Sequence, residues 1–338
     1  MKIGALLASI IVAGVTAAHA QALQPVTADN FVRAEIDMYF GGVLKDSGGA
    51  LGKFNHRRDV ASVDQQTVIR LNRDTMYSSA LFDLAAGLVT ITLPDAGKRF
   101  RSMQVISQDH YVPMVVYNTG AHTLTREKVG TRHAVVGIRI LVDPNDAKDV
   151  QQVHALQDTI KVQQKAPGTF EVPKWDQASQ KKVREALLVL ASTMPDFRGA
   201  FGAKGQVDPV RHLIGSAAAW GGNPDKDAVY LNVAPSKNDG TTVHKVVVKD
   251  VPVDAFCGRS ACTTRRGTTR RMLSTPIRST ASPERRAPTA RPPCSSADVT
   301  GRSRTASRSW RARTTRCGCI ARVPRFSAAS GSFPRRGP

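Results

Sequence analysis

The sequence predicts an α+β fold, mainly β with a helical insertion, and three observations support this prediction. Short runs of alternating apolar and polar residues follow one another over residues 67–142, which is typical of an antiparallel sheet. Helical spacing of apolar residues replaces this alternation over residues 146–194. Two more strand-like runs, residues 228–233 and 243–248, follow the helical part.

The N-terminus predicts a secretory signal peptide in residues 1–20. Met1-Lys2 supplies a short positive region, residues 3–17 are apolar, and Ala18-His19-Ala20 fits a small-x-small cleavage site. The apolar run is shorter than the roughly 20 residues that span a bilayer. We therefore expect cleavage, a periplasmic or secreted protein, and no membrane span after the signal is removed.

Residues 21–145 are expected to form an N-terminal β-rich domain with a leading helix. Thr27-Ala28-Asp29 can cap a helix over residues 30–39, which the glycine-rich residues 41–52 are expected to break. A strand-like run with Val68 and Leu71 comes next. The expected strands after it cover residues 77–84, 89–93, 101–106, 112–117, 123–125 and 134–142.

Residues 146–220 are expected to be a helical insertion. Val150, Val153, Leu156, Ile160 and Val162 recur at helical spacing, and a second helix is expected over residues 176–194. Residues 196–220 are expected to be a mixed connection. In residues 221–256, where a second β domain would start, the two strands are joined by Lys237-Asn238-Asp239-Gly240, which indicates a hairpin.

The composition changes at Phe256, and residues 257–338 are expected to be a frameshifted, disordered tail. They contain 19 Arg, no Lys, two acidic residues and all five cysteines, so most of the formal charge of +21 lies there. Few apolar residues and strong self-repulsion favour disorder. A basic arm that binds nucleic acid or an acidic surface is the alternative, but such an arm has no reason to exclude Lys.

The genetic code offers a test of the frameshift. Allowed codons for residues 257–268, read from the third base, give Trp-Ser-Ile-Ser-Val-Tyr-Asn-Ala-Lys-Gly-Tyr, which alternates as a strand does. Binding of nucleic acid by the tail would then be nonspecific. Cys317-Gly318-Cys319 is too closely spaced for a usual zinc site, so no metal is expected there.

Two polar segments are candidates for chemistry. Asn72-Arg73-Asp74-Thr75 is a dense polar run between an apolar strand and Tyr77, and its Arg73 and Asp74 would either bind a polar ligand or pair with one another to fix a sheet corner. Asp109-His110 follows a strand, where His110 would act as a general base oriented by Asp109 or lie at the surface as an ordinary histidine.

Other segments give weaker indications. His122 and His133 could meet His110 at a metal, but the spacing matches no ligand pattern, so no metal and no cofactor are expected. Trp220-Gly221-Gly222-Asn223 permits a close backbone approach to a ligand or a loop closed by Trp220. The chain has no Gly-x-Ser-x-Gly elbow, phosphate-binding loop or dinucleotide fingerprint, so those enzyme classes lose support.

These segments carry a family resemblance. The run from Asn72 to Ser78, followed by Phe82-Asp83-Leu84 and residues 89–94, resembles the bacterial family called domain of unknown function 1254. Residues 221–224, 228–231 and 252–256 resemble the start of its usual partner, domain of unknown function 1214. The resemblance covers residues 25–256 and implies two β-sandwich-like domains, the second jelly-roll-like, with a helical insertion between them. Residues after Phe256 lack the partner domain's later strands, so the second domain is expected to be incomplete.

The resemblance implies no assigned activity, and two functions remain open. The first is binding of a small molecule or glycan, with Asn72, Arg73, Tyr77, Trp220 and Asn223 as ligand residues. The second is a periplasmic hydrolase that uses His110 with Asp109 or Asp74.

Overall fold

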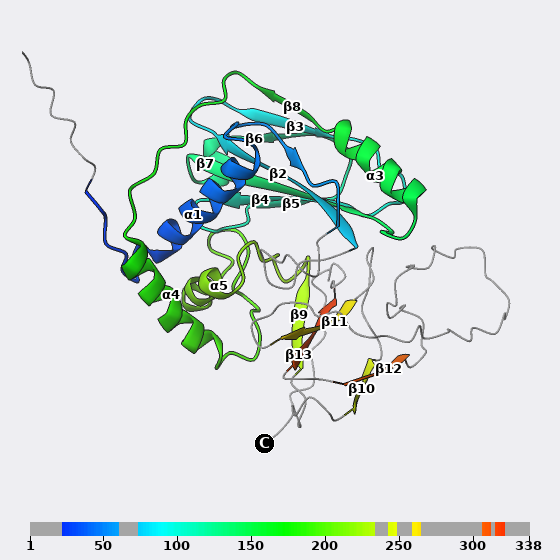
Figure 1. Cartoon of the computed structure of the whole chain (residues 1–338). Helices are drawn as coiled ribbons and strands as arrows, with labels where there is room; N and C mark the ends of the chain where they lie inside the picture. Colours follow the sequence, from blue (N-terminus) through cyan, green and yellow to red (C-terminus); the bar gives the residue numbers. More distant parts are fainter. Residues whose placement is uncertain are drawn as a thin grey trace, which may run out of the picture.

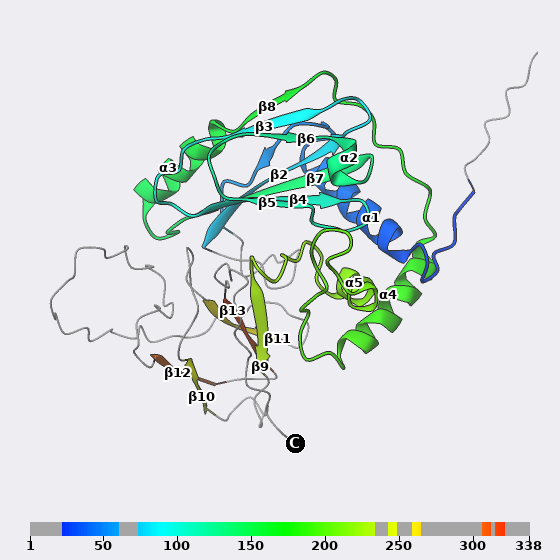
Figure 2. The same cartoon turned by 180° about the vertical axis from the view of Figure 1, so that it is seen from behind.

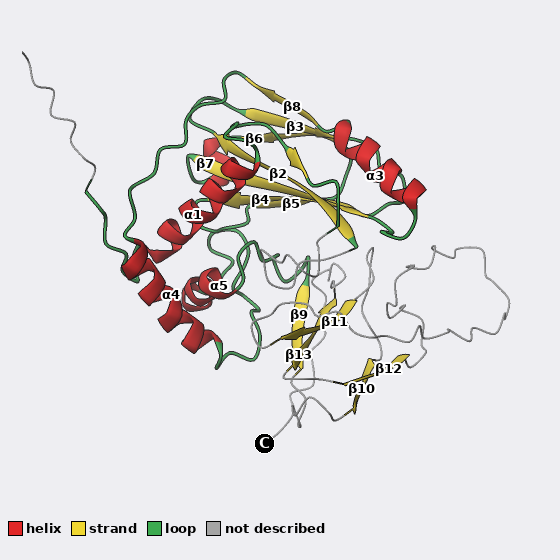
Figure 3. Ribbon diagram, viewed as in Figure 1, coloured by secondary structure: helices red, strands yellow, loops and turns green. Residues whose placement is uncertain are grey.

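Strands from the first half of the chain form two antiparallel sheets, with helices packed around them (Figures 1 and 2). The computed structural model describes residues 22–60 and 74–233 and, beyond these, strands β10 to β13; from residue 229 onward only the backbone is described. The fold is an α+β mixture of antiparallel sheets and helices, and the described strands form no closed barrel (Figure 3).

The larger sheet has five strands in the order β1-β2-β7-β4-β5. Each neighbouring pair is antiparallel. Their bounds are β1 Asn55–His56, β2 Thr75–Asp83, β4 Arg101–Ser107, β5 Met114–Val116 and β7 His133–Leu141. The smaller sheet has the order β6-β3-β8, with β3 Val89–Leu93, β6 Gly120–Leu124 and β8 Lys161–Gln164.

The main hydrophobic core lies between these two sheets. Alternate residues of β2, such as Met76 and Phe82, pack with Ile91 of β3 and Ile138 of β7. Leu81, on the opposite face of β2, packs instead with a helix. The five-stranded sheet is therefore buried on both faces, and its central strands contain short runs of consecutive apolar residues at 80–82, 105–106 and 134–136.

Helices cover the sheets from two sides. Helix α1 (Phe31–Asp46) packs on the five-stranded sheet through Ile36 and Phe40, and α3 (Ala147–Asp158) contributes Val153 to the main core. Helices α4 (Gln177–Ala191) and α5 (Pro209–Ala218) pack with the start of α1 in a separate cluster (Figure 1). The short α2 spans Arg126–Val129.

The C-terminal strands belong to two smaller sheets. One has the order β11-β13-β9, with β9 Val229–Val233, β11 Arg259–Thr264 and β13 Thr315–Ala321. The other pairs β10 (Val243–Val248) with β12 (Ala306–Arg311). The predicted hairpin is therefore wrong, because β9 and β10 lie in different sheets. Strands β11, β12 and β13 also lie within residues predicted to be disordered; the rest of that tail is outside the described residues.

Three further predictions need correction. Helix α1 continues through Gly41 and Gly42 to Asp46, because Val43 and Leu44 pack against the cluster around Phe40. The helical spacing does not extend to Val162, which belongs to strand β8 paired with β3. Residues 209–218 are a helix rather than a mixed connection: Asp208 accepts from the Arg211 N–H as N-cap, and Pro209 occupies the first turn.

Within the described residues, no helix has the length and apolar character needed to cross a membrane. The predicted signal peptide and the run with Val68 and Leu71 lie outside the described residues. The predicted domain boundary at residue 145 stays a prediction; strand β8, which follows it in the chain, pairs with β3 in the smaller sheet.

Candidate functional site

Polar side chains from neighbouring strands meet at one end of the five-stranded sheet. Arg139 of β7 lies opposite Ser102 of β4, and Tyr117 directly follows β5, the next strand. The Arg139 Nε donates to Ser102 Oγ at 3.2 Å, and its guanidinium carbon lies 5.9 Å from the centre of the Phe100 ring. The strand register thus brings a guanidinium, a hydroxyl and an aromatic ring together.

The turn of residues 221–227, which we call the β9 turn, lies against these strands (Figures 1 and 2). Gln104 Nε2 of β4 donates to the carbonyl oxygens of Gly221 and Gly222, at 3.3 and 2.9 Å. Arg139 Nη2 donates to Asn223 Oδ1 at 3.3 Å. Tyr117 Oη donates to Asp227 Oδ1 at 2.7 Å. We call Tyr117, Arg139, Asn223 and Asp227 the junction site.

The junction site contains an acceptor whose hydrogen bonding is incomplete. Asp227 is 6% exposed, and its Oδ2 is buried without a hydrogen-bond partner in the described part of the chain. Leaving such an oxygen unpaired costs about 1–3 kcal/mol. Arg139, which contacts the same turn through Asn223, is half-buried, and Asn223 is buried. The site therefore combines a buried carboxylate oxygen with a guanidinium that donates only, and the Phe100 ring lies near both Arg139 and the Tyr117 that binds Asp227.

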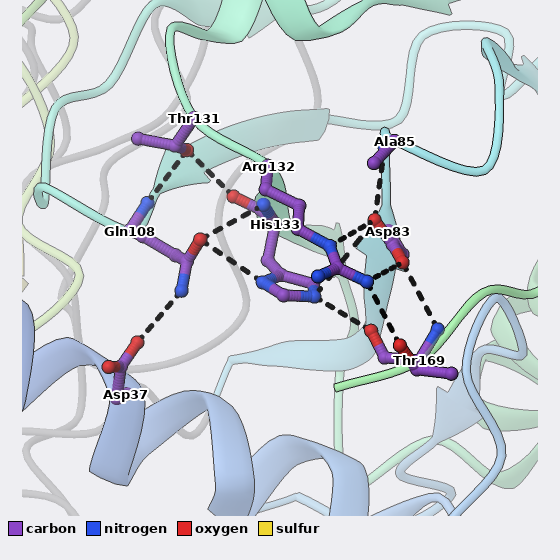
Figure 4. Close-up of polar contacts among 8 residues, drawn as sticks. All are labelled: Asp37, Asp83, Ala85, Gln108, Thr131, Arg132, His133 and Thr169. Carbon is purple, nitrogen blue, oxygen red and sulfur yellow. Dashed lines mark hydrogen bonds and ion pairs between the residues drawn. The ribbon is translucent and has the colours of Figure 1, made fainter. Parts of the chain in front are cut away.

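A second polar group is the buried network around His133, between α1 and the five-stranded sheet (Figure 4). His133 Nε2 donates to the carbonyl of Thr169 at 2.8 Å, and its Nδ1 lies 3.1 Å from Gln108 Oε1. Gln108 Nε2 in turn donates to Asp37 Oδ1 at 2.9 Å. The network therefore connects α1 to β4, β7 and the segment that contains Thr169.

Asp83 gives the network a fixed negative charge. Its carboxylate accepts from Arg132 Nε and Nη2 at 3.0 and 2.8 Å, and from the N–H groups of Ala85 and Thr169 at 3.0 and 3.1 Å. Burial raises the pKa of Asp83, but these donors outweigh it and lower the pKa to about 2. Each of the two carboxylate oxygens accepts two hydrogen bonds, so we interpret the network as structural.

The other ionisable groups of the network shift according to their burial. Desolvation raises the pKa of Asp37 above its ordinary value, against the hydrogen bonds from Gln108 and Trp175. Desolvation also lowers the pKa of His133, although the Thr169 carbonyl and Asp83 oppose this effect. The buried histidine is thus less basic than a free one.

His110 is completely buried rather than at the surface. Its Nδ1 lies 2.8 Å from Ser216 Oγ, and its Nε2 accepts from the Gly221 N–H at 3.0 Å. Burial, with a smaller contribution from the nearby His212, lowers the pKa of His110 to about 3. Because both ring nitrogens have protein partners, His110 has no free lone pair with which to accept a proton from a substrate.

The predicted partners of His110 do not orient it. Asp109 forms an ion pair with Arg33 of α1, so its carboxylate is engaged elsewhere. Asp74 is buried at the start of β2, and its carbonyl accepts from the Val142 N–H. The predicted orientation of His110 by Asp109 is therefore wrong: the two ring nitrogens form hydrogen bonds with Ser216 and Gly221 instead.

The predicted ligand residues lie in different places. Asn223 belongs to the junction site, and Trp220 precedes the β9 turn and stacks on Tyr39 of α1 with ring centres 4.7 Å apart. Tyr77 lies in β2, opposite Arg139 in the register, and its carbonyl accepts from the Arg57 N–H. Asn72 and Arg73 lie outside the described residues.

Tyr117, Arg139 and Asp227 were not predicted as site residues from the sequence. A charged residue in the otherwise apolar strand of residues 133–141 was the available signal for Arg139. Nothing in the sequence distinguished Asp227 from the other acids of the loop. His122 and His133 do not meet His110, and in the part of the chain with described coordinates no three His, Cys, Asp or Glu residues are arranged to hold a metal ion.

A family model matches part of the chain. Residues 51–128 match a family model described as "Protein of unknown function (DUF1254)". This span begins after α1 and ends in α2, so it includes most of the strands of the two N-terminal sheets. The resemblance of the later residues to domain of unknown function 1214 stays a prediction. No curated protein matches the chain.

Two solved structures are similar to the chain. The VPA0106 protein from Vibrio parahaemolyticus aligns with a TM-score of 0.56 and 13% identity, covering 88% of this chain and 94% of that chain. A second, an uncharacterized protein from Burkholderia cenocepacia, aligns with a TM-score of 0.36 and 10% identity, over 72% of this chain and 68% of that chain. The first similarity extends the shared fold well beyond the DUF1254 match, and neither assigns an activity.

Proposed function

We propose that the protein binds a small polyhydroxylated molecule, such as a glycan unit, at the junction site. The observation that carries the proposal is Asp227, a buried carboxylate with one oxygen bonded to Tyr117 and the other without a partner among the described residues. Arg139 lies in the same site and can only donate. A ligand hydroxyl both accepts and donates, so neighbouring hydroxyls satisfy both groups at once.

Aromatic rings beside the polar groups support the same ligand class. The rings of Phe100 and Tyr117 lie 6.1 Å apart, and Arg139 extends over Phe100. A sugar has an apolar face of C–H groups as well as hydroxyls, which suits a site that combines rings with a few convergent polar groups. Hydrolysis by His110 lacks this support, because both nitrogens of its ring are bonded within the protein.

The test is saturation-transfer NMR of the full chain with D-glucose, D-galactose and N-acetyl-D-glucosamine. We expect at least one of these sugars to bind, and Asp227→Ala and Arg139→Ala each to weaken that binding by at least tenfold. Asp225→Asn is the matched control, since Asp225 lies in the same turn but accepts from the Gly199 N–H. Binding that persists in Asp227→Ala would show that the junction site is not the binding site.

We also propose a secreted or periplasmic location, a second β-sandwich of jelly-roll type in the intact protein, and a frameshift after Phe256. The absence of Lys among 19 Arg in residues 257–338, together with the strand-like alternative frame, supports the frameshift. Resequencing the gene across the codons for Val253 to Arg259 tests it. A restored frame with the alternative residues would support the proposal, and a confirmed frame as printed, shared by independent isolates, would contradict it.

A further inference from the structure

The β9 turn supplies two residues of the junction site, and His110 contacts its first residue. We propose that His110 is a positioning residue: its ring, fixed in one tautomer by Ser216, holds Gly221 and thereby places Asn223 and Asp227. This inference rests on the proposed function and names a residue on which the geometry of that site depends.

The backbone of His110 shows that the position is constrained. His110 has a φ of 62°, the one positive φ of a residue other than glycine in the described part of the chain. A histidine in this region costs free energy that the surrounding contacts must offset. Its ring is fully buried and meets Phe201 edge to face, with centres 5.6 Å apart.

The neighbours of His110 determine which ring nitrogen carries the proton. Ser216 Oγ donates its single hydrogen to the carbonyl of His212 at 2.8 Å. Ser216 must therefore accept from His110, which places the ring proton on Nδ1. Nε2 is left with a lone pair, and this lone pair accepts from the Gly221 N–H at 3.0 Å. The two contacts are mutually consistent only in this tautomer.

Gly221 is the point at which the β9 turn is fixed. Its φ of 72° favours glycine, and its carbonyl accepts from Gln104 while its N–H donates to His110. The next residue, Gly222, approaches Phe201 so closely that a Cβ there would lie 2.4 Å from the ring. His110, Gln104 and Phe201 thus hold the turn from three sides, two residues before Asn223.

The first experiment uses the full chain without ligand. Ring nitrogen NMR of the histidines is expected to show His110 as the Nδ1–H tautomer, without titration between about pH 5 and 8. Amide exchange of Gly221 is expected to be roughly tenfold faster in His110→Leu. His110→Gln should return it toward the original rate, because the Gln Oε1 can replace Nε2 as acceptor.

Either of two outcomes would overturn the inference. The first is an Nε2–H tautomer for His110, and the second is amide exchange of Gly221 that is no faster in His110→Leu than in the control His122→Leu. His122 lies in β6, where its ring contacts the Asn118 carbonyl instead. If His110→Leu fails to fold, Ser216→Ala takes its place: faster Gly221 exchange supports the inference, and unchanged exchange contradicts it.

Sugar binding separates this inference from the proposed function. If the unaltered protein binds none of the three sugars, the proposed function fails, while the tautomer and the exchange of Gly221 still decide the role of His110. If it binds one, His110→Leu should weaken that binding and His110→Gln should restore it. Unchanged affinity in a folded His110→Leu would overturn the positioning role.

Discussion

Replacement of Asp83 by Asn is expected to destabilise the protein by about 3 kcal/mol. The carboxylate accepts four hydrogen bonds, two from Arg132 and one each from the N–H groups of Ala85 and Thr169. An amide puts an NH₂ group against some of these donors. Removing one partner of a buried ion pair costs about 3–5 kcal/mol. We expect the lower end because the Arg132 side chain is 38% exposed and can turn to water.

Urea unfolding followed by circular dichroism measures this loss. With a denaturant slope of about 2–3 kcal/mol per molar, the transition midpoint should fall by about 1–1.5 M. Asp46→Asn is the control, since Asp46 pairs with Arg57 at the surface, where both side chains are more than 40% exposed. That change should cost under about 1 kcal/mol. Equal midpoints for the two variants would refute the structural role assigned to Asp83.

Three further predictions concern stability. Burial lowers the pKa of His110 to about 3, so between pH 6.5 and 3 only the unfolded chain takes up this proton. The free energy of unfolding should therefore be unaffected by His110 above pH 6.5 and fall as the pH decreases toward 3. In urea unfolding, His110→Gln should reduce that slope by up to about 1.4 kcal/mol per pH unit. Gly168→Ala would place a Cβ 2.5 Å from Asp83 at a φ of 74°, so its melting temperature should fall further than that of Gly97→Ala, where the space is open. Asp176→Ala removes the N-cap of α4 and should cost about 0.5–2 kcal/mol by urea unfolding, with no loss contradicting the cap.

The strands of the first region could be predicted because their signal is local. Residues 89–93 were placed at the observed bounds of β3, and β2, β4 and β7 were placed within about two residues. In each of these strands the sequence pattern and the sheet environment agree. Strand β8 was missed because Val162 continues the helical spacing of α3. Its strand conformation depends on pairing with β3, which the local sequence does not indicate.

The extension of α1 and the partners of β9 depend on tertiary contacts. Each glycine in a helix costs about 1 kcal/mol relative to alanine, so Gly41 and Gly42 predicted an early end. Burial around Phe40 outweighs that cost. The turn signal at residues 237–240 predicted a hairpin, yet β9 pairs with β13, more than 80 residues further along the chain. The residues of a turn indicate only that the chain reverses there, and they do not show that a strand pairs with a partner so far along the sequence.

We located the candidate site by asking which buried polar groups lack a hydrogen-bond partner within the described part of the chain. The face of the five-stranded sheet toward α1 contains unusually many polar side chains for a buried surface, and most have protein partners: Gln108 with Asp37, Gln104 with the β9 turn, His133 with Thr169. Fully paired groups of this kind stabilise a packed layer and leave nothing for a ligand to bind. Asp227 differs: it is one of four described side chains with a buried unpaired atom, the others being Thr75, Arg101 and Trp220, and it is the one carboxylate among these four. Asn223 was predicted from its loop, but its partner Arg139 is 84 positions away in the sequence, so the site is defined by the packing of the β9 turn on the sheet rather than by a motif.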